Sequence, residues 1–295
     1  MADNYFQDVS NDIAGGTNWS LGSAPADTNS VFFLLGSTYD LTVNLDQRSV
    51  ADVDLPLLVF GGTFYKSVGD GTGSSVYKLD DVTELQVNVA GPVTQVITLD
   101  IDGLTKGVIR GTGANPKALY LYDGTTANLF ISSGNVTLGA GQTITGNIYL
   151  TQEGPTPPVL RIEAGCTLTN CNIYADAGVI DSLAELDCTL ISLTGPVHLK
   201  QRGASGEANI GAQLIASNGA KVSIETTVAA TLSNIKFSKG AVLDTTGSAF
   251  KTTISAGDVM SGAEVKVKQG VDSVACNVVG GRITGAVGTL VIPGH

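Results

Sequence analysis

The stretch from Thr143 to Leu193 contains one short pattern three times, as Thr143-Ile144-Thr145-Gly146-Asn147, Cys166-Thr167-Leu168-Thr169-Asn170 and Cys188-Thr189-Leu190-Ile191-Ser192. Its central apolar residues, Ile144, Leu168 and Leu190, lie 24 and then 22 positions apart. The same step continues to further apolar residues at Ile210, Leu232, Ile254 and Val274. A repeat of roughly 22 residues in a Gly- and Thr-rich chain with many β-branched side chains is typical of a solenoid. The sequence therefore predicts an all-β fold, a parallel β-helix.

The residues before each central position predict which side chains point inward. Every second position is mostly apolar or small, as in Ile162, Ala164 and Cys166, and again in Ala184, Leu186 and Cys188. The positions between them are polar and include Glu163 and Glu185. Because side chains alternate faces along a strand, we expect the first set inside and the second outside. The last turn fits this pattern worst, since the charged residues Asp272 and Lys268 fall at inward positions.

This register predicts which residues stack on one another. It places Cys188 over Cys166 and Leu190 over Leu168. Stacked cysteines would lie within the Cα distance of a disulfide, but in-register neighbours rarely reach the torsion that the bond requires. We therefore expect buried free thiols at these two positions.

Composition restricts the partners of the chain. Its 295 residues carry a formal net charge of −11, and only 6% of them are aromatic. Nucleic acid and anionic membranes are not expected partners, because binding phosphate groups would require clusters of basic residues. No apolar stretch is long enough for a membrane helix, and the start, Met1-Ala2-Asp3-Asn4-Tyr5, lacks the apolar core of a secretion signal. We expect a soluble protein that is synthesised in a cytoplasm.

The character of the sequence divides the chain into three parts. Residues 1–35 are expected to form an irregular arm or cap, residues 36–137 irregular first turns or a separate small β-domain, and residues 138–295 a regular β-helix. Solenoids need their terminal turns covered, so we expect the single Trp, Trp19, to serve in a cap. The candidates for assembly contacts are Trp19, Pro25, Phe32 and Phe33.

Three carboxylate pairs are the candidates for catalysis. Glu163 and Glu185 would share an outward column on adjacent turns, which would bring them near the separation of about 5 Å in a retaining glycosidase. Asp100 and Asp102 would lie on one face of one strand, as would Glu185 and Asp187. Solvated outer faces are the plainer interpretation of all three pairs, because the surrounding sequence offers no aromatic platform for a sugar.

Metal and cofactor motifs are weak in this chain. Asp70, in the loop Asp70-Gly71-Thr72-Gly73-Ser74-Ser75, could donate oxygens to calcium, but the loop lacks the acid spacing of an EF-hand and its glycines alone predict an exposed turn. His198 has no neighbouring Cys or Ser in sequence that would suggest a relay. No cofactor is expected.

The start without a signal, the Trp-containing arm and the Thr- and Gly-rich turns resemble β-helical virion proteins of tailed bacteriophages. That resemblance covers about residues 36–292 and implies a tailspike, fibre or capsid decoration, commonly a homotrimer. The arrangement Asn18-Trp19-Ser20…Gly22…Pro25…Asp27 is also similar to the opening of β-helical passenger domains of bacterial surface adhesins. Those domains carry a signal peptide and a C-terminal translocator, and this sequence shows neither.

The sequence therefore predicts a non-enzymatic virion structural protein, a capsid decoration or head-fibre protein that contacts other capsid or tail proteins through residues 1–35. Its short, acidic chain with few candidate site residues favours this role over enzymatic ones. A tailspike-like protein that binds or cleaves host glycans, and a bacterial surface adhesin, are the alternatives.

Overall fold

The computed structural model describes residues 2–7, 16–26, 28–34, 45–46, 54–65, 67–90, 92, 94–204, 206–268, 270–285 and 289–291. Within these ranges nearly all regular structure is parallel β-strand, and the only helix is the short 3-10 helix η1 (Gly16–Asn18). The predicted all-β parallel β-helix, with turns of about 22 residues, is confirmed. The chain forms two compact units, which comprise Met1–Thr145 with Glu153–Pro158, and Gly146–Gln152 with Val159–His295. We call them unit 1 and unit 2.

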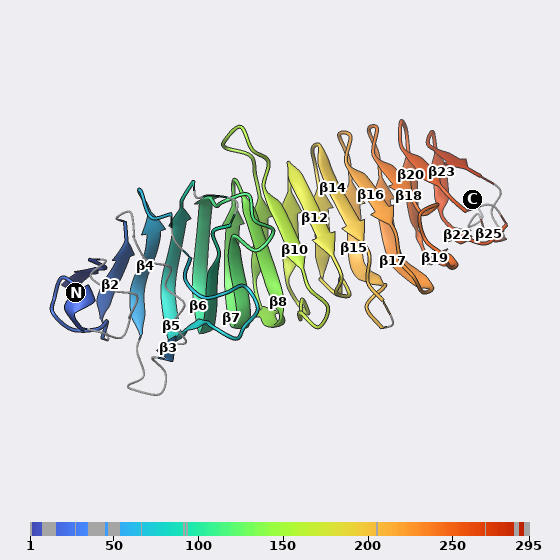
Figure 1. Cartoon of the computed structure of the whole chain (residues 1–295). Coiled ribbons are helices and arrows are strands. Elements are labelled where there is room, and N and C mark those ends of the chain that lie inside the picture. The colour runs from blue at the N-terminus through green and yellow to red at the C-terminus, as the bar shows by residue number, and fades with distance from the viewer. Residues whose placement is uncertain are drawn as a thin grey trace. The chain divides into compact units, whose positions relative to one another are not determined.

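Unit 1 is a ladder of parallel strands, shown in blue to green in Figure 1. It contains β1 (Ala2–Tyr5), β2 (Asn29–Phe33), β3 (Leu45–Asp46), β4 (Leu55–Gly61), β5 (Tyr77–Asn88), β6 (Ile97–Gly111), β7 (Leu119–Ile131) and β8 (Asn135–Ile144). Strands β1, β2, β4, β5, β6, β7 and β8 pair in that order, and β3 pairs with β5. One fully buried column runs through the ladder by register, consisting of Phe33, Phe60, Val87, Ile109 and Ile131. Stacking of apolar side chains along such columns is the main source of stability in a solenoid.

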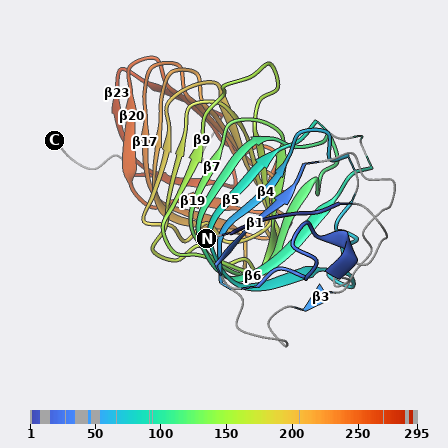
Figure 2. The same cartoon turned by 90° about the vertical axis from the view of Figure 1, so that its left-hand side faces the viewer.

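The first strand of unit 1 is covered along its free edge. The N–H of Ser20 donates to the carbonyl of Tyr5 at 2.9 Å, and the N–H of Tyr5 donates to the hydroxyl of Ser20, also at 2.9 Å. The side chain of Asn4 is buried and donates to the carbonyl of Ser23 at 3.1 Å. An uncovered strand edge invites pairing with other chains. Residues 16–23, which include η1 near the N-terminus in Figure 2, therefore act as a cap on β1.

Unit 2 has three ladders of parallel strands, one for each side of a three-sided coil. The first ladder contains β9 (Asn147–Leu150), β11 (Asn172–Ala175), β13 (Leu190–Leu193), β15 (Ile210–Ala216), β17 (Ala230–Phe237), β20 (Gly257–Met260) and β23 (Asn277–Val279). The second contains β10 (Val159–Ile162), β12 (Gly178–Ser182), β14 (Val197–Gln201), β16 (Lys221–Ile224), β18 (Val242–Asp244), β21 (Glu264–Lys266) and β24 (Arg282–Thr284). The third joins the beginnings of β15 and β17 to β19 (Thr252–Ile254), β22 (Ser273–Ala275) and β25 (Thr289–Val291).

The downstream half of the predicted register is confirmed. Ile210 pairs with Leu232, Leu232 with Ile254, and Ile254 with Val274, and all four side chains are buried. The step between these residues varies by only two positions because each turn has nearly the same corner lengths.

The upstream half of the predicted register is wrong. Leu190 pairs with Asn172 and Gln213, not with Leu168, and the residue that points inward is Ile191. Position 210 is bridged by Leu186 instead of Leu190. The two Cys-Thr-Leu segments are alike in letters but lie at different points of their turns, because the corners between them take up different numbers of residues.

Residues with a left-handed backbone mark several corners of the coil. Asn170 has a φ of 67°, a conformation that Asn tolerates in a bend. In later turns the corner is a pair of left-handed residues, Asn218-Gly219 and Lys239-Gly240. The N–H of Gly240 donates to the carbonyl of Gly262 at 3.0 Å, so these corners also bond to one another from turn to turn. Glycine accepts this backbone conformation at no steric cost.

Candidate functional site

An open groove of about 530 Å³ lies on unit 1, a volume within the range of ligand sites in proteins. Strands β4 to β7 line most of it, and the residues immediately before β2 and β4 complete its rim. Its lining consists of Thr28, Asp54, Leu55, Pro56, Asp81, Val82, Thr83, Gly103, Leu104, Thr105, Thr125 and Ala127. None of these residues was singled out from the sequence.

The groove forms where the long strands bend. Asp81 pairs with Gly103 and Gly103 with Thr125, and the register shifts between Ile101 and Gly103. Such irregularities bend a strand and re-aim its side chains. A side chain at position 103 would collide with the carboxylate of Asp81, so Gly103 both permits the bend and keeps the hollow open.

The chemistry of the groove is acidic and rich in hydroxyl groups. Asp54 and Asp81 are both exposed, and the pairing of Leu55 with Val82 places Asp54, immediately before β4, beside the part of β5 that carries Asp81. Four threonines contribute hydroxyl groups, and the partly exposed apolar lining residues are Pro56 and Ala127, since Leu55, Val82 and Leu104 are buried. Carboxylates accept hydrogen bonds, and hydroxyl groups both donate and accept them. The groove is therefore suited to a neutral ligand that carries many hydroxyl groups.

The structure separates the two glutamates that were predicted to form a pair. The ladder pairs Ile162 with Ser182, a step of 20, so the step of 22 that would align Glu163 with Glu185 does not occur there. The N–H of Glu185 donates to the Glu207 carboxylate at 2.6 Å, and its own carboxylate accepts from Asn209 at 3.2 Å. Neither glutamate lines the groove described above. Catalysis by this pair stays a prediction, without the shared column that suggested it.

The second acidic pair does not share a face either. Asp100 is buried and Asp102 is exposed. The strand was predicted to alternate regularly, but the register shifts on both sides of Ile101 break the alternation.

The loop that contains Asp70 is less exposed than its composition indicated. Gly69 and Gly71 are buried, and the N–H of Gly71 donates to the hydroxyl of Thr98 at 2.8 Å. A side chain at Gly73 would collide with the ring of Tyr122. The glycines are therefore required for close packing onto β6 and β7, in addition to turning the chain.

The carboxylate of Asp70 already has partners from its own loop. It accepts hydrogen bonds from the N–H and the hydroxyl of Thr72, at 2.9 and 2.7 Å. Slight burial acts to raise the pKa of Asp70, but these bonds lower it below its ordinary value. Within the described parts of the chain, no three His, Cys, Asp or Glu side chains gather as metal ligands. The geometry is that of a turn in which Asp70 bonds its own backbone.

The predicted assembly residues differ in exposure. Trp19 and Phe33 are buried and pack edge to face, with ring centroids 5.5 Å apart. Pro25 is also buried. Phe32 is half-buried and stacks on the ring of Tyr5 at 4.8 Å. Trp19, Pro25 and Phe33 thus have little surface to offer a partner, whereas Tyr5 and Phe32 lie at the surface of the cap.

A histidine–serine contact on unit 2 was missed in the sequence. The Nε2 atom of His198, on β14, lies 2.9 Å from the hydroxyl of Ser223, on β16, although the sequence had suggested no Ser beside it. Burial, together with Lys221 and Lys200, lowers the pKa of His198. Because Ser223 is buried, this contact joins two strands instead of presenting a nucleophile.

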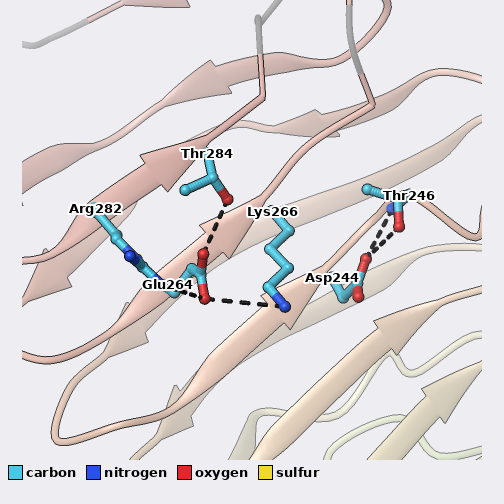
Figure 3. A network of polar contacts seen from close by, with 6 residues as sticks. All are labelled: Asp244, Thr246, Glu264, Lys266, Arg282 and Thr284. Atoms are coloured by element: carbon cyan, nitrogen blue, oxygen red, sulfur yellow. Dashed lines mark hydrogen bonds and ion pairs between the residues drawn. The ribbon is translucent and has the colours of Figure 1, made fainter.

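Charged residues alternate along the outer face of the second ladder. Successive register partners there are Arg161, Asp181, Lys200, Ser223, Asp244, Lys266 and Thr284. Figure 3 shows the end of this column together with Glu264 and Arg282, which are register partners two positions earlier on their strands. Glu264 accepts from Arg282 and Thr284, both at 3.1 Å, and lies 3.9 Å from Lys266. These partners lower the pKa of Glu264 against the opposing effect of desolvation. Opposite charges on neighbouring strands favour the correct register.

The chain matches no protein-family model, and the searches of curated proteins and of solved structures returned no match. Within its described residues, no helix has the length and apolar character needed to span a membrane.

Proposed function

We propose that this protein is a non-enzymatic structural component of a bacteriophage virion, a capsid decoration or head-fibre protein that docks through its N-terminal cap. The observation that carries the proposal is that the cap exposes two large apolar side chains. Tyr5 is 40% exposed although it stacks on Phe32, and Leu21 is 49% exposed. Both side chains belong to segments that are hydrogen-bonded to each other, since the N–H of Ser20 donates to the carbonyl of Tyr5 and the N–H of Leu21 donates to the side-chain oxygen of Asn4. Apolar patches held on a rigid base are typical of protein–protein contacts.

The capped solenoid suits such a role on physical grounds. Its parallel ladders bond every turn to the next, and solenoids built in this way unfold slowly. A decoration protein must remain folded on the particle surface and present one docking surface. Homotrimeric assembly belongs to the same proposal, and the mass of the purified protein in solution tests it.

Replacing the exposed side chains of the cap should weaken docking without unfolding the protein. We expect the double variant Tyr5→Ser/Leu21→Ser to bind purified capsids of the encoding phage roughly thirtyfold or more weakly, because exposed anchors of this size contribute about 2 kcal/mol or more. Co-sedimentation with capsids that lack the protein measures the binding. Circular dichroism should be unchanged, because the cap is held by backbone bonds and by buried side chains.

The matched control for docking is Phe250→Ser, which replaces an apolar side chain of unit 2 that is 55% exposed. It should bind capsids like the unmodified protein. Undiminished binding by the cap variant, or an equal loss in the control, would count against docking through the cap.

A second candidate function, binding of a host glycan, is favoured by the groove of unit 1. Sugars offer many hydroxyl groups to carboxylates and threonines, and the partly exposed Pro56 can contact a C–H face. We expect Asp81→Asn to weaken binding of host capsular or lipopolysaccharide oligosaccharides about tenfold, because hydrogen bonds to charged groups contribute about 1.5–3 kcal/mol. Calorimetry measures the affinity.

The exposed Asp176 of unit 2 provides the control for the glycan experiment, as Asp176→Asn. A reducing-sugar assay, with Glu163→Gln and Glu185→Gln, separates binding from cleavage. If the unmodified protein binds no such oligosaccharide, this second function is excluded and the docking proposal is unaffected.

A further inference from the structure

Two cysteines of unit 2 meet side by side on consecutive turns. The Sγ atoms of Cys171 and Cys188 lie 3.3 Å apart. Both side chains are buried, and the cysteines occupy the corners just before β11 and β13. The N–H of Thr189 donates to the carbonyl of Cys171 at 2.9 Å, which fixes the two corners against each other. Sequence spacing had paired Cys188 with Cys166, and the structure pairs it with Cys171.

The four thiols of the chain differ in their electrostatic surroundings. The hydrogen bond between Cys171 and Cys188 lowers the pKa of Cys171, whereas the same contact and burial raise the pKa of Cys188. Burial raises the pKa of Cys166 to about 12 and that of Cys276 to about 11. Because the thiolate is the reactive form of cysteine, Cys171 is the thiol best prepared to react, with Cys188 as its neighbour.

We propose that Cys171 and Cys188 form a two-electron redox site, which a peroxide converts into a disulfide that joins two consecutive turns of the β-helix. The inference rests on the contact between the two sulfur atoms and is independent of the proposed docking function. Hydrogen peroxide is close to water in size, so it reaches a buried sulfur atom through small local openings of the corner.

The chemistry balances without any further reactant. The Cys171 thiolate attacks one peroxide oxygen, an S–O bond forms, the O–O bond breaks, and the departing hydroxide takes up a proton to become water. Cys188 then attacks the sulfenic sulfur of Cys171, the S–S bond forms, the S–O bond breaks, and the oxygen leaves as a second water molecule with the proton of Cys188. Two thiols are oxidised and one peroxide is reduced to two water molecules.

The disulfide would act as a staple on unit 2. It would close a loop from residue 171 to residue 188 and so add a covalent link between two turns that backbone hydrogen bonds and buried side chains otherwise hold together. A disulfide that closes a loop of this length restricts the conformations of the unfolded chain and slows the unfolding of the two turns that it joins. A protein that moves from a reducing to an oxidising environment would become more resistant to unfolding, and a thiol reductant would reverse the change.

The test treats the purified full-length chain with hydrogen peroxide, then denatures it and alkylates its remaining thiols without a reductant. We expect two of the four cysteines to escape alkylation and the intact mass to fall by two hydrogen atoms. Cleavage before Asp176 and Asp187 separates Cys171 from Cys188, so the two fragments should remain linked until a reductant is added. Unfolding in denaturant should slow roughly tenfold or more on oxidation.

Variants assign the linkage to these two residues. Cys171→Ser and Cys188→Ser should each abolish the cross-link, while Cys276→Ser should keep it. Cys166→Ser should also keep it, which matters because residue 166 shares a fragment with residue 171. If a serine variant does not fold, fragment mapping of the unmodified protein still shows which two cysteines form the disulfide. Four alkylated thiols after oxidation, a link through Cys166 or Cys276, or accumulation of sulfinic acid in place of the disulfide would overturn the proposal.

Discussion

Replacing Phe33 with Ala is expected to lower the free energy of unfolding of the capped end of unit 1 by about 4 kcal/mol, because truncating a buried Phe leaves a large cavity. Phe33 is fully buried. Its ring contacts five other aromatic rings, those of Phe6, Trp19, Phe60, Phe64 and Tyr77. The cap and the first strands therefore share one aromatic core, and loss of its central ring should loosen them together.

Hydrogen exchange of the backbone amides measures this effect locally, which suits a solenoid whose turns need not unfold as one. Exchange should accelerate in residues 2–7 and 16–34 and remain unchanged in unit 2. The neighbouring Phe32 is the matched control, because it is half-buried and mainly stacks on Tyr5. Phe32→Ala should cost only about 1 kcal/mol. Equal effects of the two substitutions would contradict a cap that depends on its buried core.

Replacing Asp272 with Ala is expected to destabilise the end of unit 2 by about 4 kcal/mol, because each buried donor left without an acceptor costs about 1–3 kcal/mol. Asp272 is fully buried. Its carboxylate accepts from the hydroxyl of Thr245 at 2.6 Å, and from the N–H groups of Thr252 and Lys268 at 2.8 and 2.7 Å. Asp272→Asn keeps one acceptor oxygen and should cost about half as much.

Urea unfolding followed by circular dichroism, with hydrogen exchange over residues 244–285, measures the loss. Asp176→Ala is the control, since Asp176 is exposed and its replacement should change the stability by less than about 0.5 kcal/mol. If Asp272→Ala lowers the free energy of unfolding no more than this control does, the three donors must form hydrogen bonds with water in the variant, and the prediction is wrong.

Asp272 also shows how far the residue pattern can be trusted. The pattern placed this carboxylate and Lys268 inside and treated both as a poor fit. The structure does bury Asp272, and it satisfies the carboxylate with donors from three different segments. Lys268 lies only partly inside and donates to the carbonyls of Ser248 and Ala249. No pattern along the chain reveals such partners, because they come from neighbouring turns.

The functional surfaces were harder to predict than the fold. The groove depends on a register shift at Gly103, and its lining residues come from five separate segments of the chain. The alternating charges of the second ladder could have been found by scanning for opposite charges about 20 residues apart. The exposure of Tyr5 and Leu21 could not be found in this way, because which apolar residues of the cap are covered depends on how residues 16–23 fold back onto β1.

By itself the sequence determined the class of the fold and the step of its coil, because apolar residues recurring at a nearly constant interval can be buried together only if the chain winds onto itself. The same periodicity was sufficient to align Ile210 with Val274 three turns further on. Only the tertiary structure decided which cysteines touch, which acids are buried and where the groove opens. The corners can differ in length from turn to turn at little energetic cost. The register between turns therefore depends on how the side chains of neighbouring turns pack, and a constant interval along the chain does not predict it.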